Sequence, residues 1–260
     1  MADKQYIIPA PATGIKSVPN FRDAGDMPVN GGKRIRSNMI FRSASPDNIS
    51  RKDIDNLHRL GIRTIIDLRA PYESGNKVRR IDGIETVSLP LDFEKKTREN
   101  LIPLLKRKDG MEHIPALIDS LYQEILDGSV GVFREVVGLL LDPSRTPLLI
   151  HCQAGKDRTG IMCALIQLSL DAGHGSIISS YMESNSALMA IFRKRLTVRK
   201  ILTLGFFPAD RVLFAITVRE ENMLSVIERV KNHYGGIEGY FSRSGPVNSE
   251  FSRLKELFVT

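Results

Sequence analysis

Apolar runs that end in charge or in a turn mark the predicted strands of this chain. They occupy residues 40–43, 64–69, 86–91 and 147–151, and each is short enough for one strand. Apolar residues at helical spacing occupy residues 50–61, 114–128, 132–140, 161–170, 224–230 and 251–258. Strands that alternate with helices predict an α/β fold, with a central and mainly parallel sheet of about four to five strands flanked by helices.

The domain organisation follows from where this periodicity fails. Residues 1–17 contain prolines and show no pattern, so we expect an N-terminal arm. Residues 18–260 are expected to form a single domain, because a chain of 260 residues suits one large domain or a domain with an insertion. Residues 174–219 are less regular and hold a cluster of basic residues, which indicates a helical lid or insertion there.

The helix at 161–170 is apolar on nearly all sides, which predicts a central buried helix. It follows the strand at 147–151 and a loop that contains glycine. Strand, loop and buried helix in this order are typical of an anion site at a helix N-terminus.

Composition narrows the class of protein. The chain is 42% hydrophobic and 26% charged, as in an ordinary globular protein, and it has only two cysteines. A disulfide framework is therefore excluded. A structural zinc site is not expected either, because cysteine and histidine are few, and we expect no metal and no cofactor.

The net charge of +7 indicates an acidic partner, such as a phosphorylated protein, an anionic lipid or nucleic acid. Nucleic acid is not expected, since no stripe of arginine and lysine is interleaved with aromatic residues. The sequence shows neither a bilayer-spanning apolar run nor the pattern of a signal peptide. We expect a cytoplasmic location, while export by a route that reads no signal peptide stays open.

The loop after the strand at 147–151 can supply the chemistry of phosphate ester cleavage. That reaction needs an ionised nucleophile, donors for three phosphate oxygens and an acid for the leaving oxygen. Cys152 is the candidate nucleophile, because the helix dipole, the loop amides and Arg158 favour its thiolate. Arg158 offers a planar fork for two phosphate oxygens, and the five residues between it and Cys152 let the loop curl back.

The remaining groups of this loop are assigned to substrate binding. Backbone N–H groups from Gln153 to Arg158 can converge on one anion. Gly155 supplies either a positive φ or a close approach of backbone to phosphate. The Thr159 hydroxyl can donate to Cys152, and His151 braces the loop from behind. The predicted binding residues are Gln153, Ala154, Gly155, Lys156, Asp157, Arg158 and Thr159.

Residues 151–160, His-Cys-Gln-Ala-Gly-Lys-Asp-Arg-Thr-Gly, resemble the signature loop of cysteine-dependent tyrosine and dual-specificity phosphatases. The closer form is similar to that of an atypical tyrosine phosphatase family of bacteria and fungi. Blocks at 20–25, 41–44, 67–73 and 234–240 resemble other motifs of that family. The resemblance implies the cysteine-phosphatase fold and hydrolysis of phosphotyrosine, with phosphoserine and phosphothreonine as further candidates, through a cysteinyl-phosphate intermediate.

Three aspartates compete for the role of proton donor. Tyrosine phosphatases often carry this acid on a loop after Trp-Pro, and the chain has no tryptophan. Asp157 lies inside the loop, where members of the similar family also carry aspartate. Asp92 follows a predicted strand, where dual-specificity phosphatases keep their acid. Asp67 is expected to pair with a nearby arginine, to orient the loop or to bind Arg158. We favour Asp157, with Asp92 second.

Lys156 widens the range of candidate substrates. Phosphoinositide phosphatases have a similar Ala-Gly-Lys segment in which the lysine adds charge for a second phosphate, so phosphoinositides are an alternative substrate class. In the other interpretation, Lys156 points to solvent. The basic residues at 193–200 fit either transient contact with a membrane surface or a solvated face. The oligomeric state stays open.

Three other classes of protein are less compatible with this loop. A nucleotide-binding loop needs a glycine where Ile150 stands and Ser or Thr where Asp157 stands. A rhodanese-type sulfurtransferase also places cysteine in an anion loop, but Arg158 followed by Thr159 and Gly160 argues against it. A silent phosphate-binding module is disfavoured because all the reactive groups are present.

Overall fold

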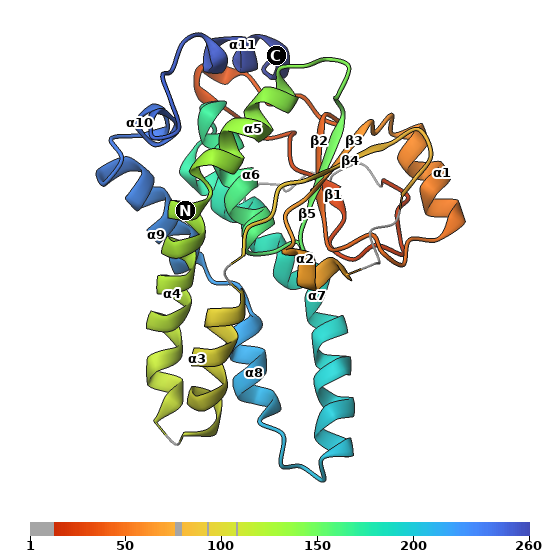
Figure 1. Cartoon of the computed structure of the whole chain (residues 1–260), viewed down its shortest axis with the longest axis vertical. Coiled ribbons are helices and arrows are strands. Elements are labelled where there is room, and N and C mark those ends of the chain that lie inside the picture. Colours follow the sequence, from red (N-terminus) through yellow and green to blue (C-terminus); the bar gives the residue numbers. More distant parts are fainter. Residues whose placement is uncertain (1–12, 76–79, 93, 108) are drawn as a thin grey trace, which may run out of the picture.

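A five-stranded sheet forms the centre of the protein in the computed structural model, which describes residues 13–75, 80–92, 94–107 and 109–260 (Figure 1). The strands lie in the order β1 (Arg22–Asp23), β2 (Ile40–Ser43), β5 (Leu148–His151), β3 (Thr64–Asp67) and β4 (Glu85–Ser88). β1 runs antiparallel to β2, and the other neighbouring strands are parallel. The predicted α/β fold with a mainly parallel sheet is confirmed.

Helices cover both faces of the sheet, which explains why its inner strands are short and apolar. In the central strand β5, Leu148 and Ile150 face the larger core and Leu149 faces the smaller one, because successive side chains alternate along a strand. The smaller core lies under α1 (Arg51–Arg59). The larger core is closed by α4 (Gly110–Gly128), α5 (Val130–Leu140), α6 (Arg158–Ser169), α9 (Glu220–Asn232), α10 (Ile237–Ser242) and α11 (Glu250–Phe258).

Helix α1 begins where its sequence predicts and also holds part of the chain before the sheet. The Ser50 hydroxyl accepts the N–H of Asp53 at 3.2 Å, which caps the helix. The Asp53 carboxylate accepts the N–H groups of Lys16 and Ser17 at 3.1 and 2.7 Å. The last residues of the predicted arm therefore pack against α1, and residues 1–12 lie outside the described part.

The helix predicted to be central and buried is α6. It is enclosed by α4, α5, α7, α10 and α11, and its Ile161 and Leu165 are completely buried. It begins with Arg158, seven residues after β5 ends at His151. The loop between β5 and α6 is thus fixed at both ends by buried elements.

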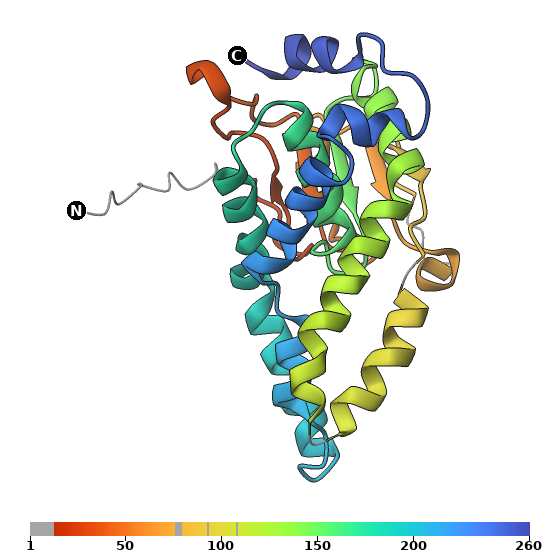
Figure 2. The same ribbon diagram turned by 90° about the vertical axis from the view of Figure 1, so that its left-hand side faces the viewer.

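Residues 174–219 are largely helical, as expected for this segment, although their sequence pattern is irregular. They contain α7 (His174–Leu202), a continuous helix of 29 residues, and α8 (Ala209–Ile216). The first half of α7 packs on the body of the protein through Ile177, Tyr181 and Leu188, whereas its last turns extend away from the sheet (Figures 1 and 2). No single apolar stripe runs along the whole helix, and this explains the weak sequence signal.

The sequence pattern did not indicate five further elements: β1, α10, η1 (Asn30–Gly32), α2 (Pro71–Ser74) and α3 (Glu94–Lys106). Helix α3 pairs with α4, and both extend past the sheet towards the same end of the molecule as α7 and α8 (Figure 2). Within the described residues, no helix combines the length and the hydropathy that crossing a bilayer requires.

Candidate active site

The loop at residues 152–157 lies at the carboxyl end of β5, in the middle of the sheet. In parallel sheets this edge is where ligands bind. Cys152 opens the loop with 3% of its surface exposed, and it is not in a disulfide. Arg158 closes the loop as the first residue of α6 and is also buried. The structure therefore brings the predicted nucleophile and arginine to the two ends of one short loop.

Gly155 gives the loop its shape. It has a φ of 68°, as one of the two sequence predictions required. A Cβ atom at this position would lie 2.2 Å from the carbonyl oxygen of Ser43 in β2. Only glycine permits this close approach of the two backbones. The approach is therefore made to β2, against which the loop packs.

Two side chains from the N-terminal half of the chain hold the outer side of the loop. Asn20 donates to the carbonyl oxygens of Gly155 at 2.8 Å and Ala154 at 3.2 Å, and Arg42 donates to that of Gly155 at 2.8 Å. Arg22 in turn donates to the side-chain oxygen of Asn20. Burial and the nearby charge of Arg42 lower the pKa of Arg22 to about 9.

The inner side of the loop has unused hydrogen-bond donors. Across the described part of the chain, the backbone N–H groups of residues 153–157 donate to no protein acceptor. The carbonyl groups of Ala154 and Gly155 instead accept hydrogen bonds from Asn20 and Arg42 on the outer side of the loop. Consecutive N–H groups of this kind, next to a helix N-terminus, form a ready anion site.

Arg158 is held by Glu73 rather than by Asp67. The guanidinium and the Glu73 carboxylate form two parallel contacts of 2.5 and 2.7 Å, with both side chains buried. The carbonyl of Leu91 accepts a further N–H of Arg158 at 3.2 Å. Glu73 is fixed in turn, because it accepts the N–H of Ala70 at 2.9 Å at the start of α2. The arginine fork is therefore oriented before any ligand binds.

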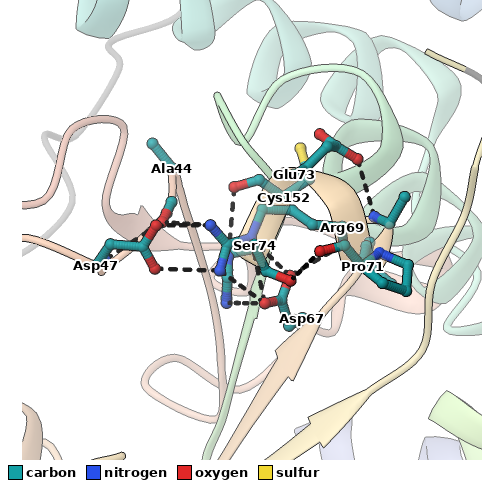
Figure 3. A network of polar contacts seen from close by, with 12 residues as sticks. Ala44, Asp47, Asp67, Arg69, Pro71, Glu73, Ser74 and Cys152 are labelled. Carbon is teal, nitrogen blue, oxygen red and sulfur yellow. Dashed lines mark hydrogen bonds and ion pairs between the residues drawn. The ribbon is translucent and has the colours of Figure 1, made fainter. Parts of the chain in front are cut away.

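Asp67 pairs with an arginine, which is one of the three roles that the sequence predicts for it. Its partner is Arg69, whose guanidinium lies between the carboxylates of Asp47 and Asp67 at 2.7 and 2.8 Å (Figure 3). His151 lies 3.8 Å from Asp67 and donates from Nδ1 to the carbonyl of Cys152 at 3.3 Å. Burial lowers the pKa of His151 although the Asp67 carboxylate opposes this effect. A neutral His151 therefore supports the loop from behind.

Asp157 accepts hydrogen bonds from two sides. Lys156 donates to its carboxylate at 2.6 Å, and the hydroxyl of Tyr122 in α4 donates to its other oxygen. The hydroxyl groups of Tyr122 and Tyr181 lie 2.6 Å apart. Burial, followed by the negative charge of Asp157, raises the pKa of Tyr122 well above its usual value, so its hydroxyl stays protonated. Lys156 does not point to solvent, since it is paired and only 14% exposed.

Asp92, the second candidate acid, is exposed and accepts the hydroxyl of Tyr72 at 2.8 Å. It follows Leu91, whose carbonyl contacts Arg158. Asp157 therefore lies within the loop, whereas Asp92 lies next in sequence to a residue that contacts Arg158.

The hydrogen bond predicted from Thr159 to Cys152 is not formed. The Thr159 hydroxyl is completely buried, and among the described residues it has no hydrogen-bond partner. Cys163 is a core residue, as predicted, and burial raises the pKa of its thiol. Within the described ranges, no group of three or more His, Cys, Asp and Glu side chains could hold a metal ion.

Sequence reasoning missed the supporting residues of this site. Asn20, Arg42 and Glu73 stand in the blocks that carry the family resemblance, but their spacing gives no hint of what they contact. Tyr122 lies on a helix whose apolar stripe was recognised, and no local signal distinguishes it from a core tyrosine. Only the fold brings these four side chains to the loop.

Comparison with known proteins assigns the chain to a family. The tyrosine phosphatase family model matches residues 13–260, so the chain belongs to that family. A Cupriavidus necator protein provisionally named a tyrosine-protein phosphatase is 26% identical over 227 residues, which cover 86% of this chain and 80% of that protein. The predicted resemblance to this class of phosphatases is confirmed.

The names of two further relatives describe two different classes of substrate. The triple specificity protein phosphatase PtpB of Mycobacterium tuberculosis is 24% identical over 271 residues, covering 92% of this chain and 96% of PtpB. An inositol diphosphatase of Arabidopsis thaliana is 31% identical over 137 residues, which cover 48% of this chain and 51% of that protein.

Proposed function

We propose that this protein is a cysteine-dependent phosphatase that hydrolyses phosphotyrosine through a cysteinyl-phosphate intermediate. One observation carries this: Cys152 and a fixed Arg158 flank the N–H groups of residues 153–157, which have no protein acceptor in the described chain. These groups match what a phosphate monoester presents, namely oxygens that accept hydrogen bonds around one phosphorus atom. Membership of the tyrosine phosphatase family supports the same reaction.

The reaction then proceeds in two steps at one sulfur atom. The Cys152 thiolate attacks phosphorus, a P–S bond forms, and the bond to the leaving oxygen breaks as that oxygen takes a proton. The N–H groups of residues 153–157 and the Arg158 fork bind the non-bridging oxygens. Water then attacks the phosphorus of the phosphocysteine, and the P–S bond breaks. The thiolate is restored, and both protons of the water leave on the released phosphate. The predicted binding residues Gln153, Ala154, Gly155, Lys156, Asp157, Arg158 and Thr159 all belong to this loop and the first turn of α6.

We propose Asp157 as the proton donor, with Asp92 as the second candidate. Lys156 and Tyr122 donate to the two carboxylate oxygens of Asp157 and hold this side chain in the loop. A phosphate dianion in the loop offers Lys156 a second partner. In the first step, the Asp157 carboxyl group gives its proton to the leaving oxygen.

Tyr122 is a positioning residue in this scheme, because it acts through its hydrogen bond to Asp157. Replacing it in Tyr122→Phe removes one hydrogen bond to a charged group, for which a loss in kcat on the order of tenfold is expected. The loss should be large for phenyl phosphate, whose leaving group needs a proton. It should be small for 2,4-dinitrophenyl phosphate, whose leaving group does not. The measurement is kcat for both esters.

Tyr234→Phe is the matched control, since Tyr234 donates to Asp127 at 2.7 Å in a comparable tyrosine–aspartate pair at the surface. It should change neither rate. An equal loss on both esters in Tyr122→Phe would show that Tyr122 supports the fold of the site and does not position the acid.

Two substrate classes follow from the loop. The name of PtpB describes a triple specificity protein phosphatase, which supports phosphoserine and phosphothreonine beside phosphotyrosine. Lys156 favours phosphoinositides as a second candidate, because its ammonium group lies in the loop and can move from Asp157 to a second phosphate. The relative named as an inositol diphosphatase adds support for this candidate.

A substrate panel tests both candidates with wild type and Lys156→Ala. Wild type should hydrolyse a phosphotyrosine peptide in the presence of EDTA, and vanadate should block it. In Lys156→Ala, the ratio of kcat/KM for a phosphoinositide to that for the peptide should fall on the order of tenfold. Lys255→Ala is the control, because Lys255 pairs with Asp171 at 2.7 Å far from the loop in sequence. If wild type leaves phosphoinositides intact, the second candidate fails and the first stands.

We further propose that residues 18–260 act as one phosphatase domain, and that α7 and α8 form a helical lid or insertion within it. Transient contact with a membrane surface also remains a proposal. The extension of α7 and α8 beyond the sheet supports the first point (Figure 1). The net charge of +7 supports the second.

A further inference from the structure

The connection between α7 and α8 exposes an apolar tip at the end of the molecule. It consists of Ile201, Leu202, Leu204 and Phe206, which are 68%, 77%, 88% and 90% exposed. Scattered apolar side chains are normal on a protein surface, but adjacent large ones exposed to this degree mark an interaction site. The hydrophobic effect therefore favours an arrangement in which this tip, here called the α7–α8 tip, leaves water.

Basic side chains surround the α7–α8 tip on the last turns of α7. They are Arg193, Lys194, Arg195, Arg199 and Lys200, and all are exposed. Lys200 lies 3.8 Å from the exposed Asp210 of α8. The four arginine and lysine residues before it have no ion-pair partner within the described chain. Positive charge is thus concentrated next to the apolar side chains and is left largely uncompensated.

The position of the tip leaves room for a broad, flat partner. α7 is linked to the catalytic loop at Tyr181. The Tyr181 hydroxyl contacts the hydroxyl of Tyr122 in α4, and Tyr122 donates to Asp157 of the loop. From Tyr181 to Leu202 the helix rises about 30 Å, at 1.5 Å for each residue. The α7–α8 tip accordingly lies at the narrow end of the molecule, well away from the sheet (Figures 1 and 2).

We propose that the α7–α8 tip docks on an anionic lipid bilayer, independently of the catalytic reaction. A bilayer with acidic lipids is negative at its surface and apolar beneath it. The apolar residues at the end of the tip match the apolar layer, and the basic residues behind them match the negative surface. Leu204 and Phe206 enter the level of the head groups. The long stems of Arg195, Arg199 and Lys200 lie along them while their charged ends reach lipid phosphates. A protruding tip suits a deformable surface, whereas a protein partner would have to supply both an apolar hollow and an acidic rim.

Vesicle co-sedimentation of the full chain tests this docking. The vesicles are phosphatidylcholine alone, or phosphatidylcholine and phosphatidylserine in a ratio of three to one. Wild type should bind the mixed vesicles and be released by salt. The double variant Leu204→Ser/Phe206→Ser should lose affinity by about tenfold for each side chain. Its turnover of p-nitrophenyl phosphate should equal that of wild type, which shows that the variant is folded.

Two matched controls separate the tip from the rest of the surface. Leu224→Ser replaces a leucine of α9 that is 38% exposed and should leave binding unchanged. Arg51→Gln/Lys52→Gln on α1 removes two exposed charges and should weaken binding less than Arg195→Gln/Arg199→Gln does. No binding of wild type to mixed vesicles would overturn the docking. So would equal binding by the serine double variant, or a Phe206-dependent dimer in ultracentrifugation without lipid.

Discussion

Cys152→Ser is expected to abolish turnover of phosphotyrosine peptides, with kcat reduced by at least about 10⁴-fold. A serine hydroxyl stays protonated where a thiol can ionise, and among the described residues no histidine or carboxylate forms a hydrogen bond with the Cys152 side chain that could remove that proton. The N–H groups of residues 153–157 and the Arg158 fork are unchanged. The variant should therefore still bind the peptide, and calorimetry should measure an affinity close to the wild-type KM.

Cys163→Ala is the control for this replacement. Cys163 is the second cysteine of the chain and lies buried within α6, outside the catalytic loop. Its removal leaves a small cavity and is expected to lower the free energy of unfolding slightly while kcat is retained. Loss of turnover in Cys163→Ala with Cys152→Ser still active would reverse the assignment of the nucleophile.

The second large effect is expected for Asp157→Asn. Removal of the proton donor should lower kcat for a phosphotyrosine peptide by about 10²–10⁴-fold, the usual range for a general acid. The asparagine cannot deliver a proton, so the decrease in rate at high pH that reports the acid should disappear. Turnover of 2,4-dinitrophenyl phosphate should be nearly unaffected, because its leaving group needs no proton. The measurement is the pH–rate profile of each variant with both substrates.

Asp92→Asn decides between the two candidate acids. Asp92 is exposed and its described partner is Tyr72, so its replacement should leave the fold intact and kcat within a few-fold of wild type. If the decrease at high pH disappears only in Asp92→Asn, Asp92 is the donor. Asp157 would then serve to hold Lys156 and the start of α6.

The catalytic loop and the elements that flank it could be predicted because their signals are local. β5 is an apolar run, α6 is apolar on nearly all sides, and the cysteine, glycine and arginine of the loop lie within one short segment. The pattern of a strand followed by a buried helix reports burial, which is a property of each residue and its near neighbours in sequence.

The supporting contacts could not be predicted, because they join residues that are distant in sequence. Glu73 and Arg158 are 85 positions apart, Tyr122 and Asp157 are 35 apart, and Asn20 and Gly155 are 135 apart. Periodicity says which face of an element is buried, but not which polar side chain of another element meets it. For the same reason Asp67 could be expected to pair with an arginine, while the choice between Arg69 and Arg158 needed the fold.

α7 shows a second limit of sequence patterns. This single helix packs on the protein core near Tyr181, whereas Ile201 and Leu202 at its C-terminal end are exposed to solvent. An apolar residue at helical spacing normally indicates a buried face, and this inference fails where a helix extends beyond the body. The exposed tip is therefore visible only in the structure.

The most direct test of the account is to trap the covalent intermediate. Wild-type protein is mixed with a phosphotyrosine peptide, quenched in acid within the first turnover, digested and analysed by mass spectrometry. We expect one phosphate on the peptide that contains Cys152, formed and lost at rates compatible with kcat, and none in Cys152→Ser. Phosphate on another residue, or steady turnover by Cys152→Ser, would contradict the cysteinyl-phosphate mechanism.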